Sequence, residues 1–80
     1  MTTLVQYRQA KANNPDMLIL RGDSDFLMAF DEDARLLADT CGLTVHSSNL
    51  GTITSGFPRF SAPRYLEMLD AAGISYLEER

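Results

Sequence analysis

Residues 21–34 read RGDSDFLMAFDEDA, and much of the architecture can be reasoned out from this stretch. Its five consecutive apolar residues, 26–30, stand between two acidic clusters. A short apolar run bounded by turn residues predicts a buried strand. The polar residues 21–24 predict a tight connection from the preceding apolar run, residues 17–20, so that the two runs pair as antiparallel strands. The acidic residues from Asp31 onward predict the start of a helix, with Asp31 as its cap.

The same alternation of strand and helix patterns continues on both sides of this stretch. A capping-box pattern at Thr3 and Gln6 predicts a helix over residues 3–12. Helical spacing of apolar residues predicts helices over residues 31–41 and 61–72, and Gly42 and Gly73 are placed to end these two. Further strands are expected at residues 43–46, 53–57 and 74–77, the last two parallel and joined by the third helix. The expected inward faces of the second and third helices are Ala34, Leu37, Ala38 and Cys41, and Tyr65, Met68, Leu69 and Ala72.

The sequence therefore predicts one small α/β (α+β) domain, with a mixed sheet of about four to five strands flanked by three helices. A chain of 80 residues supports a single thin core. Its 45% hydrophobic and 22% charged content is typical of a globular domain. Neither a membrane-spanning apolar run nor a signal peptide is present, so we expect a cytoplasmic protein.

Motifs for catalysis, nucleotides and metals are missing from the sequence. It contains no phosphate-binding loop, GxGxxG or HExxH pattern, and its single histidine, His46, cannot make a metal site alone. Cys41, the only cysteine, cannot form an internal disulfide, and its place on an apolar helix face near a helix C-terminus predicts an inert thiol with a raised pKa. We therefore expect no enzyme activity, no cofactor, no metal and no ATP.

Several short sequence motifs, taken in order, resemble those of the N-terminal mismatch-recognition domain (domain I) of the MutS DNA mismatch-repair family. The resemblance extends over nearly the whole chain, and residues 1–80 would then be one stand-alone domain, without the clamp, lever and ATPase domains of the family. The residues of this chain that carry the resemblance are Gln6-Tyr7, Lys11, residues 15–20, residues 24–34, residues 56–58, Tyr65-Leu66, Leu69, Gly73 and residues 79–80.

The resemblance implies a role for two residues of the central strand. In the family, a phenylalanine stacks on a mispaired or unpaired base, and a glutamate two residues later hydrogen-bonds that base; residues i and i+2 of a strand point to one face, so both can reach one nucleotide. Phe26 holds the phenylalanine position, but Met28 replaces the glutamate and cannot form that hydrogen bond. Ser24 stands at a family glycine and Phe60 at a family histidine.

The sequence alone does not decide whether the Phe26 ring is buried or exposed. A strand that is apolar on both faces is commonly buried between helices, and Met28 and Phe30 are expected in the core. The resemblance instead brings the Phe26 ring out toward DNA. Arg21 and Arg59 lie near connections and are candidates to share a surface with Phe26.

The net charge of −4 limits what DNA binding can be expected. Affinity for DNA comes mostly from Lys and Arg at phosphates, and the seven basic residues here are scattered. We therefore expect weak, salt-sensitive binding to duplex DNA with a mismatched or unpaired base. The alternative is an interaction or regulatory module that keeps the MutS-like scaffold, has given up DNA and binds another repair protein.

Overall fold

The computed structural model describes residues 3–47 and 51–79. These residues form a single domain with three α-helices and a five-stranded mixed sheet, which confirms the predicted fold class. The elements are α1 (Thr3–Asn13), β1 (Leu18–Asp23), β2 (Phe26–Phe30), α2 (Asp31–Cys41), β3 (His46–Ser47), β4 (Ile53–Pro58), the 3₁₀ helix η1 (Arg59–Ser61), α3 (Ala62–Ala71) and β5 (Tyr76–Glu79). Within the described residues, no helix is both long and apolar enough to cross a membrane.

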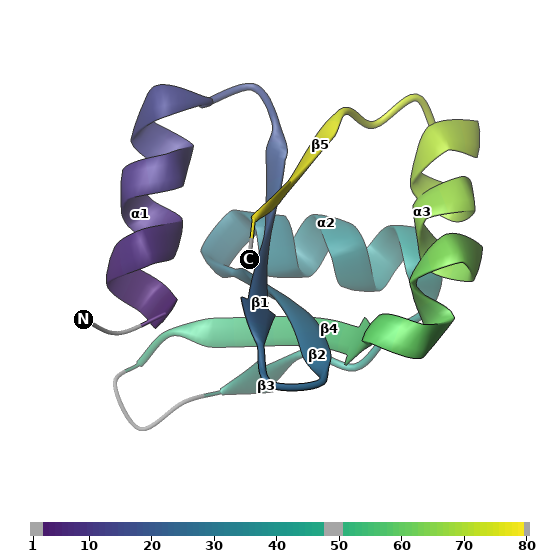
Figure 1. Ribbon diagram of the computed structural model, residues 1–80, viewed down its shortest axis with the longest axis horizontal. Coiled ribbons are helices and arrows are strands. Elements are labelled where there is room, and N and C mark those ends of the chain that lie inside the picture. Colours follow the sequence, from purple (N-terminus) through teal and green to yellow (C-terminus); the bar gives the residue numbers. More distant parts are fainter. Residues whose placement is uncertain (1–2, 48–50, 80) are drawn as a thin grey trace.

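The sheet has the strand order β3-β4-β2-β1-β5. β2 pairs antiparallel with both β1 and β4, β3 pairs antiparallel with β4, and β5 pairs parallel with β1. β4 and β5 therefore run in the same direction, as expected for strands joined by a helix, but β2 and β1 lie between them. In Figure 1, α2 lies behind the sheet, while α1 and α3 stand on opposite sides of β1 and β5.

The larger core lies between the sheet and the helices α2 and α3. Alternate residues of each strand face this side, since successive strand residues point to opposite faces. The predicted inward stripe of α2 is buried here, as expected for an amphipathic helix. The buried residues of this core are Leu18, Leu20, Leu27, Ala29, Ala34, Leu37, Cys41, Phe57, Ala62 and Leu69.

A smaller core lies on the other face, where α1 packs on the sheet. It is made of Tyr7 and Ala10 from α1, Ile19 from β1 and Phe30 from β2. The Tyr7 and Phe30 rings are in contact, with centroids 5.3 Å apart. On this face α1 packs against Phe30, at one end of β2. Phe26, at the other end of β2, lies outside this smaller core.

The helix ends differ in part from those predicted. Gly42 ends α2 in a left-handed conformation with φ +69°, as expected for a glycine in this position. The prediction that Asp31 caps α2 is wrong, because Phe30 occupies the cap position and makes no side-chain capping hydrogen bond. Asp31 is instead the first helical residue, with a φ of +53°. Ser61 holds the predicted cap position of α3 but also makes no side-chain cap bond.

Three further expectations need correction. The turn between β1 and β2 is Ser24-Asp25, because β1 continues through Asp23 and residues 21–23 are not the connection. The strand expected at residues 43–46 is reduced to the two residues of β3. On α3, Leu69 is buried but Met68 and Ala72 are exposed, because the helix contacts the core over a narrower stripe than its apolar pattern suggests.

Candidate nucleic-acid interface

The apolar stripe of β2 runs from beneath α1 out to solvent. Phe30, Met28 and Phe26 share one sheet face because they alternate along the strand. Phe30 is 8% exposed against α1, Met28 is half-buried, and Phe26 is 46% exposed at the end beside the turn. Of the two positions left open for the Phe26 ring, the exposed one is observed, whereas Phe30 lies in the core as predicted.

The β1–β2 turn is held in place by Arg59 of η1. The Arg59 backbone N–H donates to the carbonyl oxygen of Asp25 at 2.7 Å. Its Nε donates to the carbonyl oxygen of Ser24 at 2.9 Å. Ser24 has a φ of +56°, a conformation that costs any residue with a Cβ some free energy. The turn that presents Phe26 is therefore strained at one residue and clamped by another.

β4 is the strand that pairs with β2 next to Phe26 and Met28. The register pairs Phe26 with Pro58 and Met28 with Gly56, so all four lie on the same sheet face. A Cβ added at Gly56 would lie 2.5 Å from the Met28 sulfur and 2.5 Å from the Leu27 carbonyl oxygen. The Met28 side chain thus lies across Gly56 and fills the space that a side chain would need.

Arg21 does not reach the exposed end of this face. It is 6% exposed, and its Nη1 donates to Glu79 of β5 at 2.7 Å while its Nη2 donates to Gln6 of α1 at 2.8 Å. Its Nε is buried, with no hydrogen-bond partner within the described residues. Arg21 pairs in register with Met28, so the two side chains are neighbours on one face. Its positive charge is largely neutralised inside the domain.

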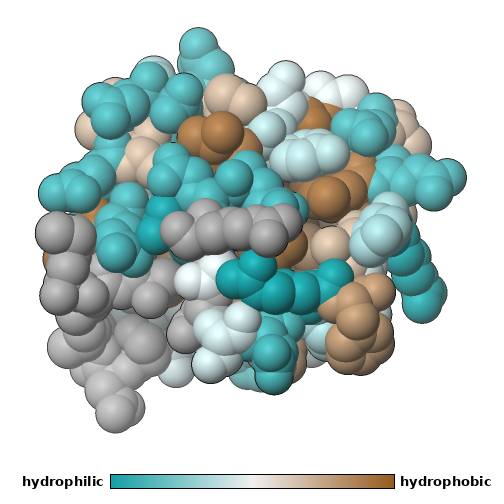
Figure 2. All heavy atoms as spheres, viewed as in Figure 1, coloured by the Kyte–Doolittle hydropathy of each residue, from teal (hydrophilic) through white to brown (hydrophobic). Residues whose placement is uncertain are grey.

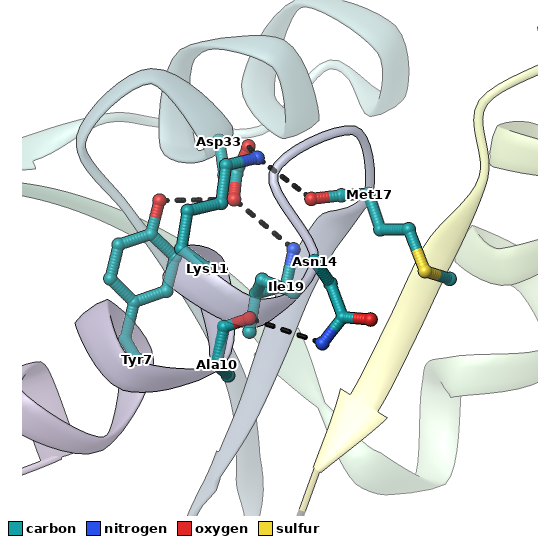
Figure 3. Close-up of polar contacts among 7 residues, drawn as sticks. All are labelled: Tyr7, Ala10, Lys11, Asn14, Met17, Ile19 and Asp33. Atoms are coloured by element: carbon teal, nitrogen blue, oxygen red, sulfur yellow. Dashed lines mark hydrogen bonds and ion pairs between the residues drawn. The ribbon is translucent and has the colours of Figure 1, made fainter.

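A buried carboxylate, Asp33, fixes α1 to the rest of the fold (Figure 3). Asp33 Oδ2 accepts hydrogen bonds from the Tyr7 hydroxyl at 3.0 Å and from the Ile19 backbone N–H at 3.1 Å. Its Oδ1 pairs with Lys11 Nζ at 3.0 Å, and Lys11 also donates to the Met17 carbonyl oxygen at 2.7 Å. A carboxylate with this many donors is well compensated for its burial. The network thus joins α1 to α2 and to β1.

Burial changes the acid–base behaviour of two groups away from the exposed face. Burial raises the pKa of the Tyr7 phenol, and the Asp33 carboxylate that accepts its hydrogen bond raises it further. Burial also raises the pKa of the Cys41 thiol, as expected for a packed and unreactive cysteine. Neither group is suited to nucleophilic chemistry. The described residues contain no cluster of three or more metal-ligating side chains.

The charges around Phe26 are mixed. Asp25, its neighbour in the turn, is exposed, and Arg59 brings a guanidinium to the same turn. Lys11 and Arg21 are engaged in ion pairs with Asp33 and Glu79. Figure 2 shows small apolar patches separated by hydrophilic residues on the visible face, without a broad apolar surface.

The structure thus brings Phe26 and Arg59 together at the β1–β2 turn, places Met28 two residues further along the same face of β2, and directs Arg21 inward. Residues 56–58 and Phe60 are recognisable from the sequence as family positions, but the sequence does not place them beside Phe26, because the pairing of β4 with β2 is a contact between residues distant in the sequence. Phe60 is 86% exposed, the highest value among the large apolar side chains of the described residues.

Comparison with known proteins gives consistent matches. A family model described as MutS domain I matches residues 2–75. The DNA mismatch repair protein MutS of Sorangium cellulosum (strain So ce56) is 35% identical to this chain over 72 residues, which cover 85% of the chain and 8% of that protein. The chain therefore spans only a small part of the length of this relative.

Proposed function

This chain belongs to the MutS domain I family, and we propose that its exposed β1–β2 hairpin contacts duplex DNA at a mismatched or unpaired base, with Phe26 as the stacking residue. The observation that carries the proposal is the 46% exposure of Phe26 at the end of a strand whose other residues are buried or half-buried. A phenylalanine that served only the core would be buried, as Phe30 and Phe57 are.

The proposed mechanism is differential unstacking. Inserting an aromatic ring into a duplex requires a base step to open, and a mispaired or unpaired base opens at lower cost than a matched one. Stacking on the ring returns about 1–3 kcal/mol per base. The Arg59 clamp supports this role, since a turn that is already ordered loses less conformational entropy on binding.

Met28 gives the proposed contact a different chemistry from the family pattern. Its thioether lies across Gly56 and has no strong hydrogen-bonding atom to offer a base edge. The site then recognises an unpaired base by stacking and by the ease with which the duplex opens. We infer that recognition is weaker, and less dependent on base identity, than with a glutamate at this position.

Affinity should also be low because few cations face this end. Two of the basic side chains, Lys11 and Arg21, are used in ion pairs within the domain, and the net charge is −4. Each phosphate contact makes the logarithm of the binding constant fall by about 0.9 per unit of log salt. Arg59 is placed to make one such contact, so measurements belong at low ionic strength.

The test is a fluorescence-anisotropy titration of the 80-residue chain with two duplexes that differ by one unpaired base. We expect tighter binding to the duplex with the unpaired base, and loss of that preference in Phe26→Ala. Leu36→Ala is the matched control, because Leu36 is 41% exposed on α2, behind the sheet. Equal affinity of the wild-type chain for both duplexes would refute the proposal.

A protein-interaction module on the same scaffold is the second candidate. It is favoured by the exposed carboxylate of Asp25 beside Phe26 and by the internal pairing of Lys11 and Arg21, all of which disfavour phosphate binding. Such a module would bind another repair protein and leave both duplexes unbound. Binding to a purified repair protein that is unchanged by Phe26→Ala, with no DNA binding at low salt, would support this alternative.

A further inference from the structure

Phe60 is an aromatic ring held almost entirely in water. It lies in the middle of η1 and is 86% exposed, whereas Phe30 and Phe57 are buried. A single exposed apolar residue is common on protein surfaces and carries no meaning by itself. Its position relative to Phe26 is what distinguishes Phe60.

Phe60 is tied to the Phe26 hairpin through its two preceding residues. Pro58 pairs in register with Phe26, and Arg59 makes both hydrogen bonds to the turn. Antiparallel partners have Cα atoms about 4.5–5.5 Å apart, and two residues of chain add at most about 7 Å. The Cα atoms of Phe26 and Phe60 therefore lie within about 12 Å of each other.

This separation suits neighbouring nucleotides of one strand. Successive nucleotides of duplex DNA rise by about 3.4 Å, so both rings can reach positions within roughly three steps of each other. Arg59 lies between the two aromatic residues in the sequence and contributes a guanidinium. Exposed aromatic rings combined with a cation are the groups that bind unstacked bases along a strand.

We propose that Phe60 is a second stacking contact to DNA, and that it receives a base within about three nucleotide steps of the unpaired base held by Phe26. The proposal rests on the proposed function and extends it from one ring to two. It predicts that the surface formed by Phe26, Arg59 and Phe60 prefers a duplex in which an unpaired base has loosened its neighbours.

The first experiment measures affinity. Phe60→Ala is expected to bind the duplex with one unpaired base at least about fivefold more weakly, from the usual worth of one base–aromatic stack. Phe60→Tyr, which keeps an aromatic ring, should retain most of the affinity, and Leu36→Ala should retain all of it. Because the ring is 86% exposed, the fold should be unaffected, and circular dichroism checks this.

The second experiment reports contact directly. The chain contains no tryptophan, so Phe60→Trp creates its only indole, whose emission can be excited selectively over that of the three tyrosines. Addition of the duplex with an unpaired base should quench its fluorescence, as stacking on a base does, while the same substitution at Leu36 should give no quenching.

The outcomes separate the two proposals. If Phe26→Ala loses the preference for the unpaired base while Phe60→Ala binds as the wild type does, the second stacking contact is refuted and the proposed function stands. If the wild-type chain has no such preference, both fall. Emission of the Phe60→Trp variant that changes with protein concentration, and not with DNA, would assign the ring to self-association and would also overturn the proposal.

Discussion

The hydroxyl of Tyr7 in α1 donates to the carboxylate of Asp33 in α2 at 3.0 Å, a buried contact between residues 26 positions apart in the sequence. Asp33 also accepts from the Ile19 backbone and pairs with Lys11, so one side chain joins two helices and the central sheet. This joint holds α1 on the sheet face where Phe30 is buried, and Phe26 lies 46% exposed at the other end of β2.

Asp33→Asn tests this joint. The carboxylate of Asp33 faces three hydrogen-bond donors, and an amide would turn an N–H group toward one of them, leaving that donor without an acceptor. We therefore expect a loss of about 2–3 kcal/mol in the free energy of unfolding. Glu32→Gln is the matched control, since it removes the same charge from the preceding, exposed residue and should cost less than about 1 kcal/mol. Urea unfolding gives both values, and similar losses for the two variants would contradict a structural role for Asp33.

Stability should fall at alkaline pH through Tyr7. The folded protein favours the neutral phenol, since burial and Asp33 raise the pKa of Tyr7 above its value of about 10 in the unfolded chain. This contribution is complete below about pH 10 and is lost as the pH rises further. When the pH is raised from about 8 to about 11, the wild type should lose more unfolding free energy than Tyr7→Phe. Equal losses would show that Tyr7 does not carry this dependence.

Ser24→Gly should stabilise the protein. Ser24 has a φ of +56°, which glycine adopts without strain. Relief of that strain, less the greater flexibility of glycine in the unfolded chain, predicts a gain of about 0.5–1 kcal/mol. Ser75→Gly is the control at an exposed loop serine without positive φ, and it should lower stability slightly. Thermal or urea unfolding of both variants decides the matter, and a loss of stability in Ser24→Gly would contradict the turn geometry.

Met28→Glu should not restore the family's base contact by itself. Arg21 lies opposite Met28 in the strand register, and its Nε is buried with no partner within the described residues. The new carboxylate should pair with Arg21, and its pKa, measured by NMR, should lie below the usual value of about 4.3 for glutamate. Met68→Glu, at an exposed position on α3, is the control. A new carboxylate with an ordinary pKa and a strengthened preference for the unpaired base would contradict this expectation.

Periodic features of the sequence predicted most of the fold. The stripe of Ala34, Leu37, Ala38 and Cys41 is buried as expected, because helical spacing records which face of a helix meets the core. The apolar run of β2 likewise predicted a strand. It could not decide which end of that strand is covered, because this depends on where α1 packs.

The remaining features depend on contacts distant in the sequence. Arg21 forms an ion pair with Glu79 and donates a hydrogen bond to Gln6, which lie 58 and 15 positions away, so no local pattern revealed its burial. Asp33 stands in a run that looks like the acidic first turn of a helix, yet it serves as a buried acceptor. The helix expected from residue 61 begins close to the predicted place, but the single 3₁₀ turn before it, which presents Phe60, has no periodic signature.

The most direct test of the central claim is an NMR titration that follows the Phe26 ring resonances at low salt. Addition of the duplex with one unpaired base should shift these resonances upfield, as ring stacking on a base requires, and a matched duplex should shift them much less. The buried Phe57 ring serves as the internal reference and should move little in either titration. Equal shifts of Phe26 with both duplexes, or no shift with either, would contradict a role for this residue in recognising mismatched DNA.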